Sequence, residues 1–370
     1  MIIIYLFLLG YCIFIIWLLD GYKNTLKLNN CVNKKTPFIS IIIAAKNESK
    51  NLLKLFSCLK KQTYPKDKYE IIIVNDKSKD NTLDILKTCN IDNLKYININ
   101  KTPIQWAPKK WAIYKGIEKS RGTIILQTDA DCYMSENWIK LMVKPFEDIS
   151  VGFVSSLTPI VSNNNTVYRK LFLLDSIAQD IFSGYAIGKG LIFSCTARSM
   201  AFRKSYFIDV QGYSSISHIL SGDDDLILHK IIHYIGCKVK FIINKNAAVF
   251  SKPPNSLYEF FIQRIRFASK GFFYYNKEFI SIELKILLPI LYMINFFICI
   301  SIVKFCNTGH ALYFFPILLK IIADYFMVYP INDNLGEKWS WVSFIMLSVF
   351  HPFYIISFGL LGPLISFKWK

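Results

Sequence analysis

Three stretches of the chain are long, apolar and free of lysine, arginine, aspartate and glutamate. They are Met1–Leu19, Ile286–Val303 and Trp341–Phe367. Each is long enough to cross the hydrocarbon layer of a membrane as a helix. A fourth apolar stretch, about His310–Tyr329, contains Lys320 and Asp324, which lie one helical turn apart and can neutralise each other against a neighbouring helix. The pattern predicts one membrane span over residues 1–20 and about three spans in a region over residues 284–367.

The first apolar stretch has no positively charged segment before it and no Ala-x-Ala-like cleavage site, so we expect a retained anchor rather than a removable signal peptide. Lysines follow it at positions 23, 27, 34 and 35. Because positively charged segments stay on the cytoplasmic side, we expect a protein of the cytoplasmic (inner) membrane whose long middle region lies in the cytoplasm. Four spans place the lysine-containing tail 368–370 on the opposite side, which conflicts with the same rule.

Between the anchor and the later spans, short runs rich in isoleucine and valine alternate with segments of helical period. The runs predict strands at Ile39–Ala44, Glu70–Val74, Leu94–Ile99 and Thr123–Gln127, each buried on both faces. The intervening segments predict helices near Asn47–Gln62, Asn81–Cys89, Pro108–Ser120 and Ser135–Phe146, with Ser135 as an N-cap. This alternation predicts an α/β domain over residues 36–250 with a mostly parallel, doubly wound sheet.

Polar residues follow three of the predicted strands, in Ala45–Glu48, Asn75–Ser78 and Asp129–Asp131. Ligands bind beyond the carboxyl ends of the strands in such sheets, so we expect these residues to share one crevice. Asp129 and Asp131 flank a single alanine. Two carboxylates so near to each other raise each other's pKa unless a cation lies between them. Hard oxygen ligands of this kind suit Mn²⁺ or Mg²⁺.

The composition narrows the range of partners. The formal net charge of +18 fits a protein that faces anionic lipid headgroups and handles phosphorylated substrates. We expect no nucleic acid partner, because the chain has no basic helix and no aromatic RNA-binding motif. The nine cysteines are scattered without a Cys-x-x-Cys pair, which argues against a disulfide framework or a zinc site.

The order of these motifs resembles that of the membrane-anchored family 2 glycosyltransferases, which have the nucleotide-sugar-binding GT-A fold. The resemblance runs from Ile39 to about Gly271. The family's Pro-Ala-x-Asn-Glu is similar to Ala44–Glu48, its Val-Asp-Asp-x-Ser-x-Asp-x-Thr to Val74–Thr82, its Gly-Lys-x-x-Ala-Leu-x-x-Gly to Pro108–Gly116, and its Asp-x-Asp to Asp129–Asp131. Asparagine replaces the first aspartate of the second motif, at position 75, whereas Asp76 is retained.

The resemblance implies roles for residues in these motifs. The implied nucleotide-binding residues are Ala45, Glu48, Asp76, Lys109 and Asp129, and Asp76 is expected to contact the nucleobase. Asp129 and Asp131 together would hold the divalent metal, Mn²⁺ or Mg²⁺, and the diphosphate of the donor. Alone, Asp-x-Asp is a weak signal that occurs in many loops and helix caps; its place after a buried strand, in order with the other motifs, favours the metal site.

A cluster of acids further along the chain resembles the family's Thr-Glu-Asp-x-Asp-Leu, in which the aspartate after glutamate is the catalytic base. Matching the closing Asp-Leu to Asp225 and Leu226 places the base at Asp223, whereas sliding the match by one residue places it at Asp224. An inverting transfer needs such a carboxylate to take the proton of the acceptor hydroxyl. The alternative is a helix N-terminus with acids that favour its macrodipole.

Residues Gln263–Phe267 are similar to the family's Gln-x-x-Arg-Trp, with phenylalanine in place of tryptophan. On a helix Gln263 and Arg266 share a face that can stabilise the departing diphosphate, and Arg264 points elsewhere. The alternative is an amphipathic helix within an interfacial segment, residues 251–282, that lies on the membrane. Both descriptions can hold, since Arg264 and Arg266 can serve different purposes.

The sequence therefore predicts an inverting, metal-dependent glycosyltransferase. We expect it to move a sugar from a nucleotide-diphosphate donor, a UDP-sugar, to a lipid or lipid-linked acceptor at the membrane. Processive polysaccharide synthesis remains an alternative, because the same Gln-x-x-Arg element occurs in such synthases. Nucleotidyl transfer is disfavoured because the loop after the first strand lacks glycine. A nucleotide-binding membrane scaffold or transport protein is a third possibility, but it gives no reason for the ordered set of motifs.

Overall fold

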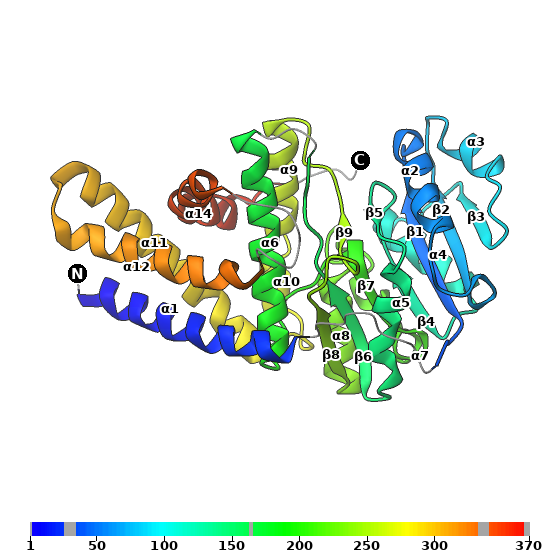
Figure 1. Cartoon of the computed structure of the whole chain (residues 1–370), viewed down its shortest axis with the longest axis horizontal. Helices are drawn as coiled ribbons and strands as arrows, with labels where there is room; N and C mark the ends of the chain where they lie inside the picture. The colour runs from blue at the N-terminus through cyan, green and yellow to red at the C-terminus, as the bar shows by residue number, and fades with distance from the viewer. Residues whose placement is uncertain (1, 26–34, 163–165, 332–339, 366–370) are drawn as a thin grey trace. The chain divides into compact units, whose positions relative to one another are not determined.

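The computed structural model describes residues 2–25, 35–162, 166–331 and 340–365, and it is drawn in Figure 1. The chain divides into two compact units. The first comprises Met1–Thr25, Ile160–Phe193 and Pro253–Phe367, and the second comprises Leu26–Pro159 and Ser194–Lys252. The lysines at positions 27 and 34 and the tail 368–370, on which the expected orientation depends, lie outside the described residues, as do Met1 and residues 366–367 of the predicted spans.

The second unit is built on a sheet whose strand order is β3-β2-β1-β4-β7-β6-β8 among the described residues. These strands are β1 (Ile39–Ala45), β2 (Tyr69–Asp76), β3 (Leu94–Ile99), β4 (Ile124–Gln127), β6 (Val151–Ser156), β7 (Met200–Arg203) and β8 (Lys238–Ile242). All neighbouring pairs are parallel except those that β7 makes with β4 and β6. A small antiparallel pair, β5 (Tyr133–Met134) and β9 (Val249–Phe250), lies apart from this sheet. The prediction of a mostly parallel α/β sheet is confirmed.

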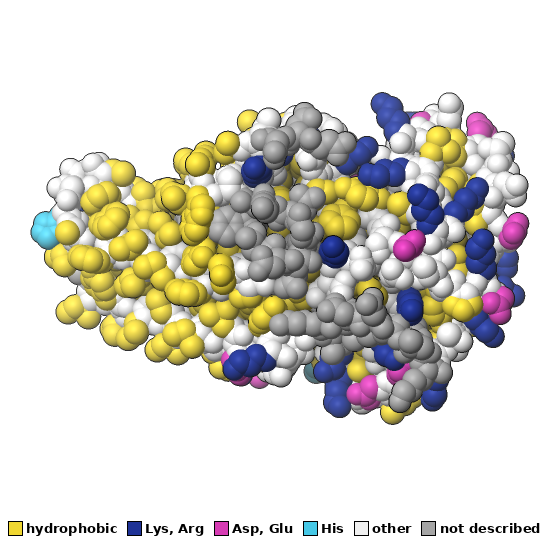
Figure 2. All heavy atoms as spheres, in the orientation of Figure 1, with side chains coloured by type: hydrophobic (Ala, Val, Ile, Leu, Met, Phe, Trp, Pro, Cys, Tyr) yellow, Lys and Arg dark blue, Asp and Glu magenta, His cyan; other side chains and the backbone are white. Residues whose placement is uncertain are grey.

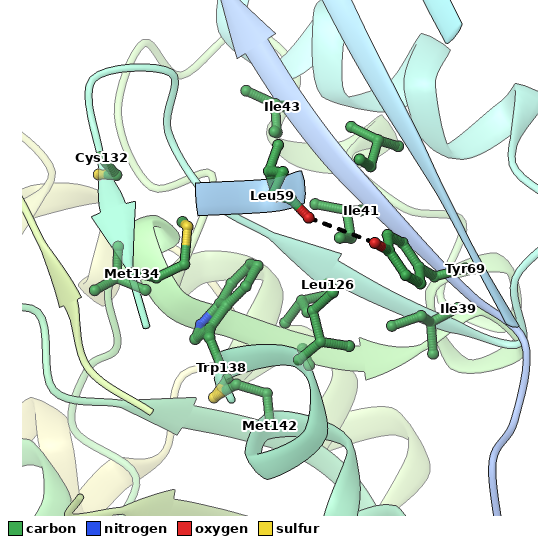
Figure 3. Close-up of a cluster of buried hydrophobic side chains, with 14 of the residues drawn as sticks. Ile39, Ile41, Ile43, Leu59, Tyr69, Leu126, Cys132, Met134, Trp138 and Met142 are labelled. Atoms are coloured by element: carbon green, nitrogen blue, oxygen red, sulfur yellow. Dashed lines mark hydrogen bonds between the residues drawn. The ribbon is translucent and has the colours of Figure 1, made fainter. Parts of the chain in front are cut away.

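Helices connect the strands of the second unit. They are α2 (Ser49–Lys60), α3 (Thr82–Lys87), α4 (Pro108–Lys119), α5 (Trp138–Val143), α7 (Lys204–Asp209) and α8 (Asp225–Ile235). Helix α2 buries Leu52, Leu55, Phe56 and Leu59, a spacing of three and four residues that places them on one face. Figure 3 shows Leu59, Trp138 and isoleucines of β1 within one cluster of buried side chains, in which the Tyr69 hydroxyl donates to the Leu59 carbonyl at 3.4 Å.

Two local expectations for this unit are wrong. Strand β3 is not buried on both faces, because it is the edge strand of the sheet and most of its side chains are partly or fully exposed. Ser135 is not an N-cap: α5 begins only at Trp138, after Asn137. The Ser135 hydroxyl instead donates to the Asn246 carbonyl at 2.8 Å and accepts from the Asn137 N–H at 3.1 Å, so it shapes the turn before the helix.

The first unit is helical in its described residues. Its helices are α1 (Ile2–Gly21), α6 (Val167–Gly188), α9 (Leu257–Ala268), α10 (Gly271–Tyr275), α11 (Ile282–Thr308), α12 (Ala311–Val328) and α14 (Trp341–Leu361). Four of them are long and apolar enough to cross a membrane: α1, α11, α12 and α14. Figure 2 shows hydrophobic side chains covering the surface over α1, α11 and α12, and Ile13, Phe315 and Leu319 are among those exposed. An apolar surface of this kind suits contact with lipid.

Helix α6 is the main element that the sequence analysis did not predict. The predicted domain over 36–250 is continuous, whereas Ile160–Phe193 belongs with the membrane-type helices of the first unit. Helix α6 buries residues on several sides, including Asp175 and Asp180. A helix enclosed by other helices lacks the single apolar stripe by which amphipathic helices are identified in sequence.

Candidate active site

The three strands that end in predicted site residues are neighbours, in the order β2-β1-β4. Because these strands run parallel, their carboxyl ends meet at the same edge of the sheet. Ala45 closes β1 and pairs in register with Asn75 of β2, while Asp76 ends β2 and Asp129 follows β4. Ala45 and Asp76 are buried, and Asp129 is partly exposed. The sheet thus brings together polar groups from positions far apart in the chain.

The loops after β1 and β2 are linked by hydrogen bonds. The Asn47 N–H donates to Ser78 Oγ at 2.9 Å, and the Glu48 N–H donates to Thr82 Oγ1 at 2.8 Å. Asn47 adopts a left-handed conformation (φ 57°), which asparagine tolerates better than most residues, and its Oδ1 accepts from the Lys79 N–H at 2.8 Å. The serine and threonine of the second motif therefore shape the loop that carries Glu48.

Asp80 links the loop after β2 to the start of α2 by hydrogen bonds. Its carboxylate accepts from the Ser49 N–H at 3.1 Å, the Thr82 N–H at 3.0 Å and the Thr82 hydroxyl at 2.5 Å. Burial alone would raise the pKa of Asp80, but these donors together lower it to about 2. Asp80 is therefore ionised and structural, held by neutral donors.

The end of β2 has polar atoms that the protein pairs only in part. Asp76 Oδ1 lies 3.2 Å from Lys77 Nζ, and the Lys77 ammonium also donates to the Thr102 hydroxyl. Asn75 donates to Asn98 Oδ1 at 2.6 Å, while the buried Oδ1 of Asn75 has no hydrogen-bond partner within the described ranges. A buried acceptor left open at a strand end suits a ligand that supplies a donor.

The centre of the candidate site is formed by Lys109, Asp129 and Asp223. Lys109 lies in the first turn of α4, which opens with Pro108, a residue suited to the start of a helix. Its ammonium lies 3.0 Å from Asp129 Oδ1 and 2.9 Å from Asp223 Oδ2. The structure thus joins residues that follow β4, open α4 and precede α8.

The charges in this cluster are not balanced. Burial alone would lower the pKa of Lys109, but Asp129 and Asp223 hold it well above its usual value, so the amine stays protonated. Burial raises the pKa of Asp129, and Asp131 and Asp223 raise it further, whereas Lys109 lowers it. One ammonium therefore faces two carboxylates, with the Asp131 carboxylate acting on Asp129 as well, and the remaining negative charge favours the binding of a cation.

Asp131 is exposed, whereas Asp129 is partly exposed and Asp223 is buried. Its neighbour Cys132 is buried, and burial together with the carboxylates of Asp131 and Asp129 raises the pKa of the Cys132 thiol. Within the described part of the chain, no three histidine, cysteine, aspartate or glutamate side chains are grouped to hold a metal ion. Two hard carboxylates on a short loop do fit an ion that completes its coordination with water and ligand oxygens, as Mg²⁺ and Mn²⁺ do.

The three consecutive aspartates lie in different environments. Asp224 is the N-cap of α8: its Oδ1 accepts from the Asp225 N–H at 2.8 Å, and its Oδ2 accepts from the Ala197 N–H at 3.1 Å. Asp225 is fully buried and accepts from the Leu226 N–H. The Asp223 carboxylate forms an ion pair with Lys109, whereas Asp224 caps α8, so the two candidates for the catalytic base have different environments.

The predicted Gln-x-x-Arg element lies in the first unit, on α9, where Gln263 and Arg266 are partly exposed. Arg264, between them, is buried and forms an ion pair with Asp175 of α6. Its guanidinium also lies over the rings of Phe260, Phe267 and Tyr354, at 5.0, 5.6 and 5.6 Å from their centroids. Burial alone would lower the pKa of Arg264, but the Asp175 carboxylate raises it above its usual value. Arg264 thus anchors α9 to the helices of its own unit.

Lys110 is a buried residue of this region that was not predicted from the sequence. Lys110 follows Lys109 in α4 and is almost completely enclosed. Its partners are backbone carbonyls more than a hundred residues away, so no side-chain motif marks them. The one available signal was the second lysine of a doublet on a face that the helical period predicts to be buried.

Known proteins resemble parts of this chain. The model of Glycosyl transferase family 2 matches residues 40–211. Glycosyltransferase AglE of Haloferax volcanii is 32% identical over 120 residues, which are 32% of this chain and 38% of that protein. A dolichyl N-acetyl-alpha-D-glucosaminyl phosphate 3-beta-D-2,3-diacetamido-2,3-dideoxy-beta-D-glucuronosyltransferase of Methanococcus voltae is 32% identical over 117 residues, 30% of this chain and 35% of that protein. The chain thus spans little more than a third of the length of these two relatives.

A solved structure resembles the whole chain. It is a mannosyltransferase from Pyrobaculum calidifontis in complex with GDP-Man and Mn²⁺, with a TM-score of 0.57 and 15% identity. The match covers 98% of this chain and 96% of that one. Together with the family match, this likeness confirms the predicted GT-A fold.

Proposed function

Because residues 40–211 form a family 2 glycosyltransferase domain, we propose that this protein is a membrane-bound enzyme that moves a sugar from a nucleotide-diphosphate donor to an acceptor hydroxyl. The observation that carries the proposal is the cluster of Lys109, Asp129 and Asp223 at the carboxyl edge of the sheet. The excess negative charge of this cluster suits a divalent metal ion, and the Lys109 ammonium suits the diphosphate that the metal would hold. A carboxylate in the same place suits a catalytic base.

The donor would bind along the ends of β1, β2 and β4. Asp76 would contact the nucleobase, and Ala45, Glu48 and Lys109 would contact the rest of the nucleotide. Asp129 and Asp131 would hold Mn²⁺ or Mg²⁺, which as a Lewis acid would stabilise negative charge on the diphosphate. The P. calidifontis mannosyltransferase, solved with GDP-Man and Mn²⁺, supports a divalent metal here. We propose a UDP-sugar as donor, with GDP-Man as the second donor to test.

Asp223 would be the base. It would take the proton of the acceptor hydroxyl as the acceptor oxygen bonds to the anomeric carbon and the bond from that carbon to the diphosphate oxygen breaks, with inversion at the carbon. Asp224 is less suited, because each of its oxygens accepts a backbone N–H. Lys109 would stabilise the departing diphosphate with charge and hydrogen bonds. The same role for Gln263 and Arg266 of the first unit is what the family resemblance implies, and it stays a prediction.

The acceptor would be a lipid or a lipid-linked sugar. Four helices of the first unit are long and apolar enough to cross a membrane, and the name of the M. voltae relative includes a dolichyl-linked substrate. An enzyme held in a membrane meets acceptors that are held there as well. We place it in the cytoplasmic (inner) membrane with the GT-A domain in the cytoplasm, because nucleotide sugars are charged and would not cross the bilayer.

The test uses the full chain in nanodiscs with a panel of nucleotide sugars, with Mn²⁺, Mg²⁺ or a chelator present. We expect release of nucleotide from one donor, dependent on metal and lost in Asp131→Asn. The exposed Asp67 of the same unit provides the matched control, Asp67→Asn, which should keep the activity. Release that persists in chelator and in Asp131→Asn would contradict the metal site.

The acceptor is then tested with membrane lipid extracts and the donor that was identified. Product length distinguishes single addition from processive polysaccharide synthesis. If no donor is cleaved or transferred while nucleotide still binds, the protein is a nucleotide-binding scaffold and the proposed enzyme activity is wrong.

A further inference from the structure

Lys110 is a buried lysine whose ammonium contacts backbone. Its side chain is 1% exposed, in the first turn of α4 beside Lys109. Lys110 Nζ donates to the carbonyl oxygens of Ile216, Ile219 and Ser221, at 2.9, 2.8 and 2.9 Å. An ammonium group has three protons to donate, so these three bonds satisfy it and offset the cost of its burial.

The segment that Lys110 holds leads directly to Asp223. A fourth hydrogen bond ties it to the same end of α4, since the Ala107 N–H donates to the Ser217 carbonyl at 2.7 Å. Gly222 follows in a left-handed conformation (φ 78°), where a Cβ atom would lie 2.6 Å from the Leu226 side chain. The backbone between Ser221 and Asp223 therefore makes a sharp turn that strongly favours glycine at position 222.

Asp223 is fixed on its other side as well. Its backbone carbonyl accepts from the hydroxyl of buried Tyr213 at 2.9 Å. Its carboxylate lies 2.9 Å from Lys109, the residue next to Lys110. One turn of α4 thus sets both the carboxylate of Asp223, through Lys109, and the backbone that carries it, through Lys110.

From this geometry we infer that Lys110 is a positioning residue, which sets the place of the Asp223 carboxylate relative to Asp129. The inference rests on the proposed function, in which Asp223 is the base. Removing the ammonium leaves three buried carbonyls without their donor, so the segment 216–221 must shift to find new partners. A misplacement of about 1 Å at a catalytic group can lower the rate by about 100-fold.

The test compares Lys110→Met with wild type in transfer and in equilibrium donor binding. Methionine keeps the length and the apolar stem of lysine and removes the charged donor. We expect kcat to fall by about 10- to 100-fold, with the KM for donor and metal-dependent donor binding within about threefold of wild type. A merely structural role would reduce the amount of folded protein and leave kcat per folded molecule unchanged.

Arg203→Met is the matched control. Arg203 also donates to three backbone carbonyls in the second unit, those of Val151, Phe146 and Asp148, but these lead to no proposed site residue. We expect this variant to lose stability and to keep its kcat per folded molecule. If Lys110→Met does not fold, Lys110→Gln is measured in the same way, because its shorter, neutral amide has two N–H donors and cannot satisfy all three carbonyls.

The outcomes separate this inference from the proposed function. An inactive wild-type protein overturns both. An active wild type with Lys110→Met, or Lys110→Gln in its place, within about threefold of its kcat overturns the role of Lys110 alone. An equal loss of kcat per folded molecule in Arg203→Met also overturns it, since the effect would then be general to the unit.

Discussion

Each unit of the molecule buries a cation against carboxylate, but the two arrangements differ in charge balance. In the first unit, Arg264 pairs with Asp175 and is enclosed by aromatic rings, so one guanidinium meets one carboxylate. In the second unit, Lys109 contacts both Asp129 and Asp223, and Asp131 adds a further acid nearby. A buried ion pair with equal charges needs no further ion to neutralise it. A partly exposed cluster with more carboxylates than ammonium groups favours a cationic ligand.

The same distinction explains the fourth predicted span. Lys320 and Asp324 form an ion pair inside α12, and the Tyr11 hydroxyl of α1 donates to Asp324 Oδ1 at 2.6 Å. The pair is therefore balanced and hydrogen-bonded against a neighbouring helix, as the sequence analysis expected. Charges in a membrane helix are tolerated in this arrangement. Charge balance, rather than burial, separates the structural pairs of this protein from its candidate site.

The largest expected effect breaks the unbalanced cluster at its proposed base. Asp223→Asn should lower kcat by about 10²- to 10⁴-fold, because the amide cannot take the acceptor proton. Donor binding should remain, since Asp129 and Asp131 are intact. Transfer assays with saturating donor, together with equilibrium nucleotide binding, measure both quantities. Full activity in this variant would show that another group is the base.

The next effect breaks the balanced pair. Arg264→Met leaves the Asp175 carboxylate buried without its partner and should destabilise the protein by about 3–5 kcal/mol. The double variant Arg264→Met with Asp175→Leu should recover most of this loss, because it removes both charges. Thermal unfolding in detergent compares the three proteins. A double variant as unstable as the single one would mean that the pair itself, rather than the unpaired charge, matters.

A smaller effect separates the two neighbouring acids. Asp224→Ala removes the N-cap of α8 and the bond to the Ala197 N–H, and it should lower the free energy of unfolding by about 1 kcal/mol. Its kcat per folded molecule should stay far above that of Asp223→Asn. The reverse order of the two variants in kcat would assign the base to Asp224.

The sequence predicted those features that depend on residue type and local spacing. The four strands were found because apolar runs recur in a recognisable order, and the polar residues that follow three of them include Asp129, which lies close to Lys109. A helix N-terminus at the three aspartates was considered only as an alternative to the catalytic base, and helix α6 was not predicted, because it depends on contacts between distant segments. Lys110 was missed for the same reason: its acceptors are main-chain atoms, which every residue carries.

The smallest effect concerns Asp80, a carboxylate held by neutral donors rather than by a cation. Its pKa in the folded protein is about 2, below the ordinary 3.8, so it stabilises the fold above pH 3.8 and this contribution is lost as the pH falls towards 2. Asp80→Asn should therefore be less stable than wild type at neutral pH, and the difference should shrink between pH 4 and 2. Thermal unfolding across this range measures it, with Asp67→Asn as the exposed control. A difference that does not change with pH would mean that the Ser49 and Thr82 donors hold the loop without favouring the ionised form.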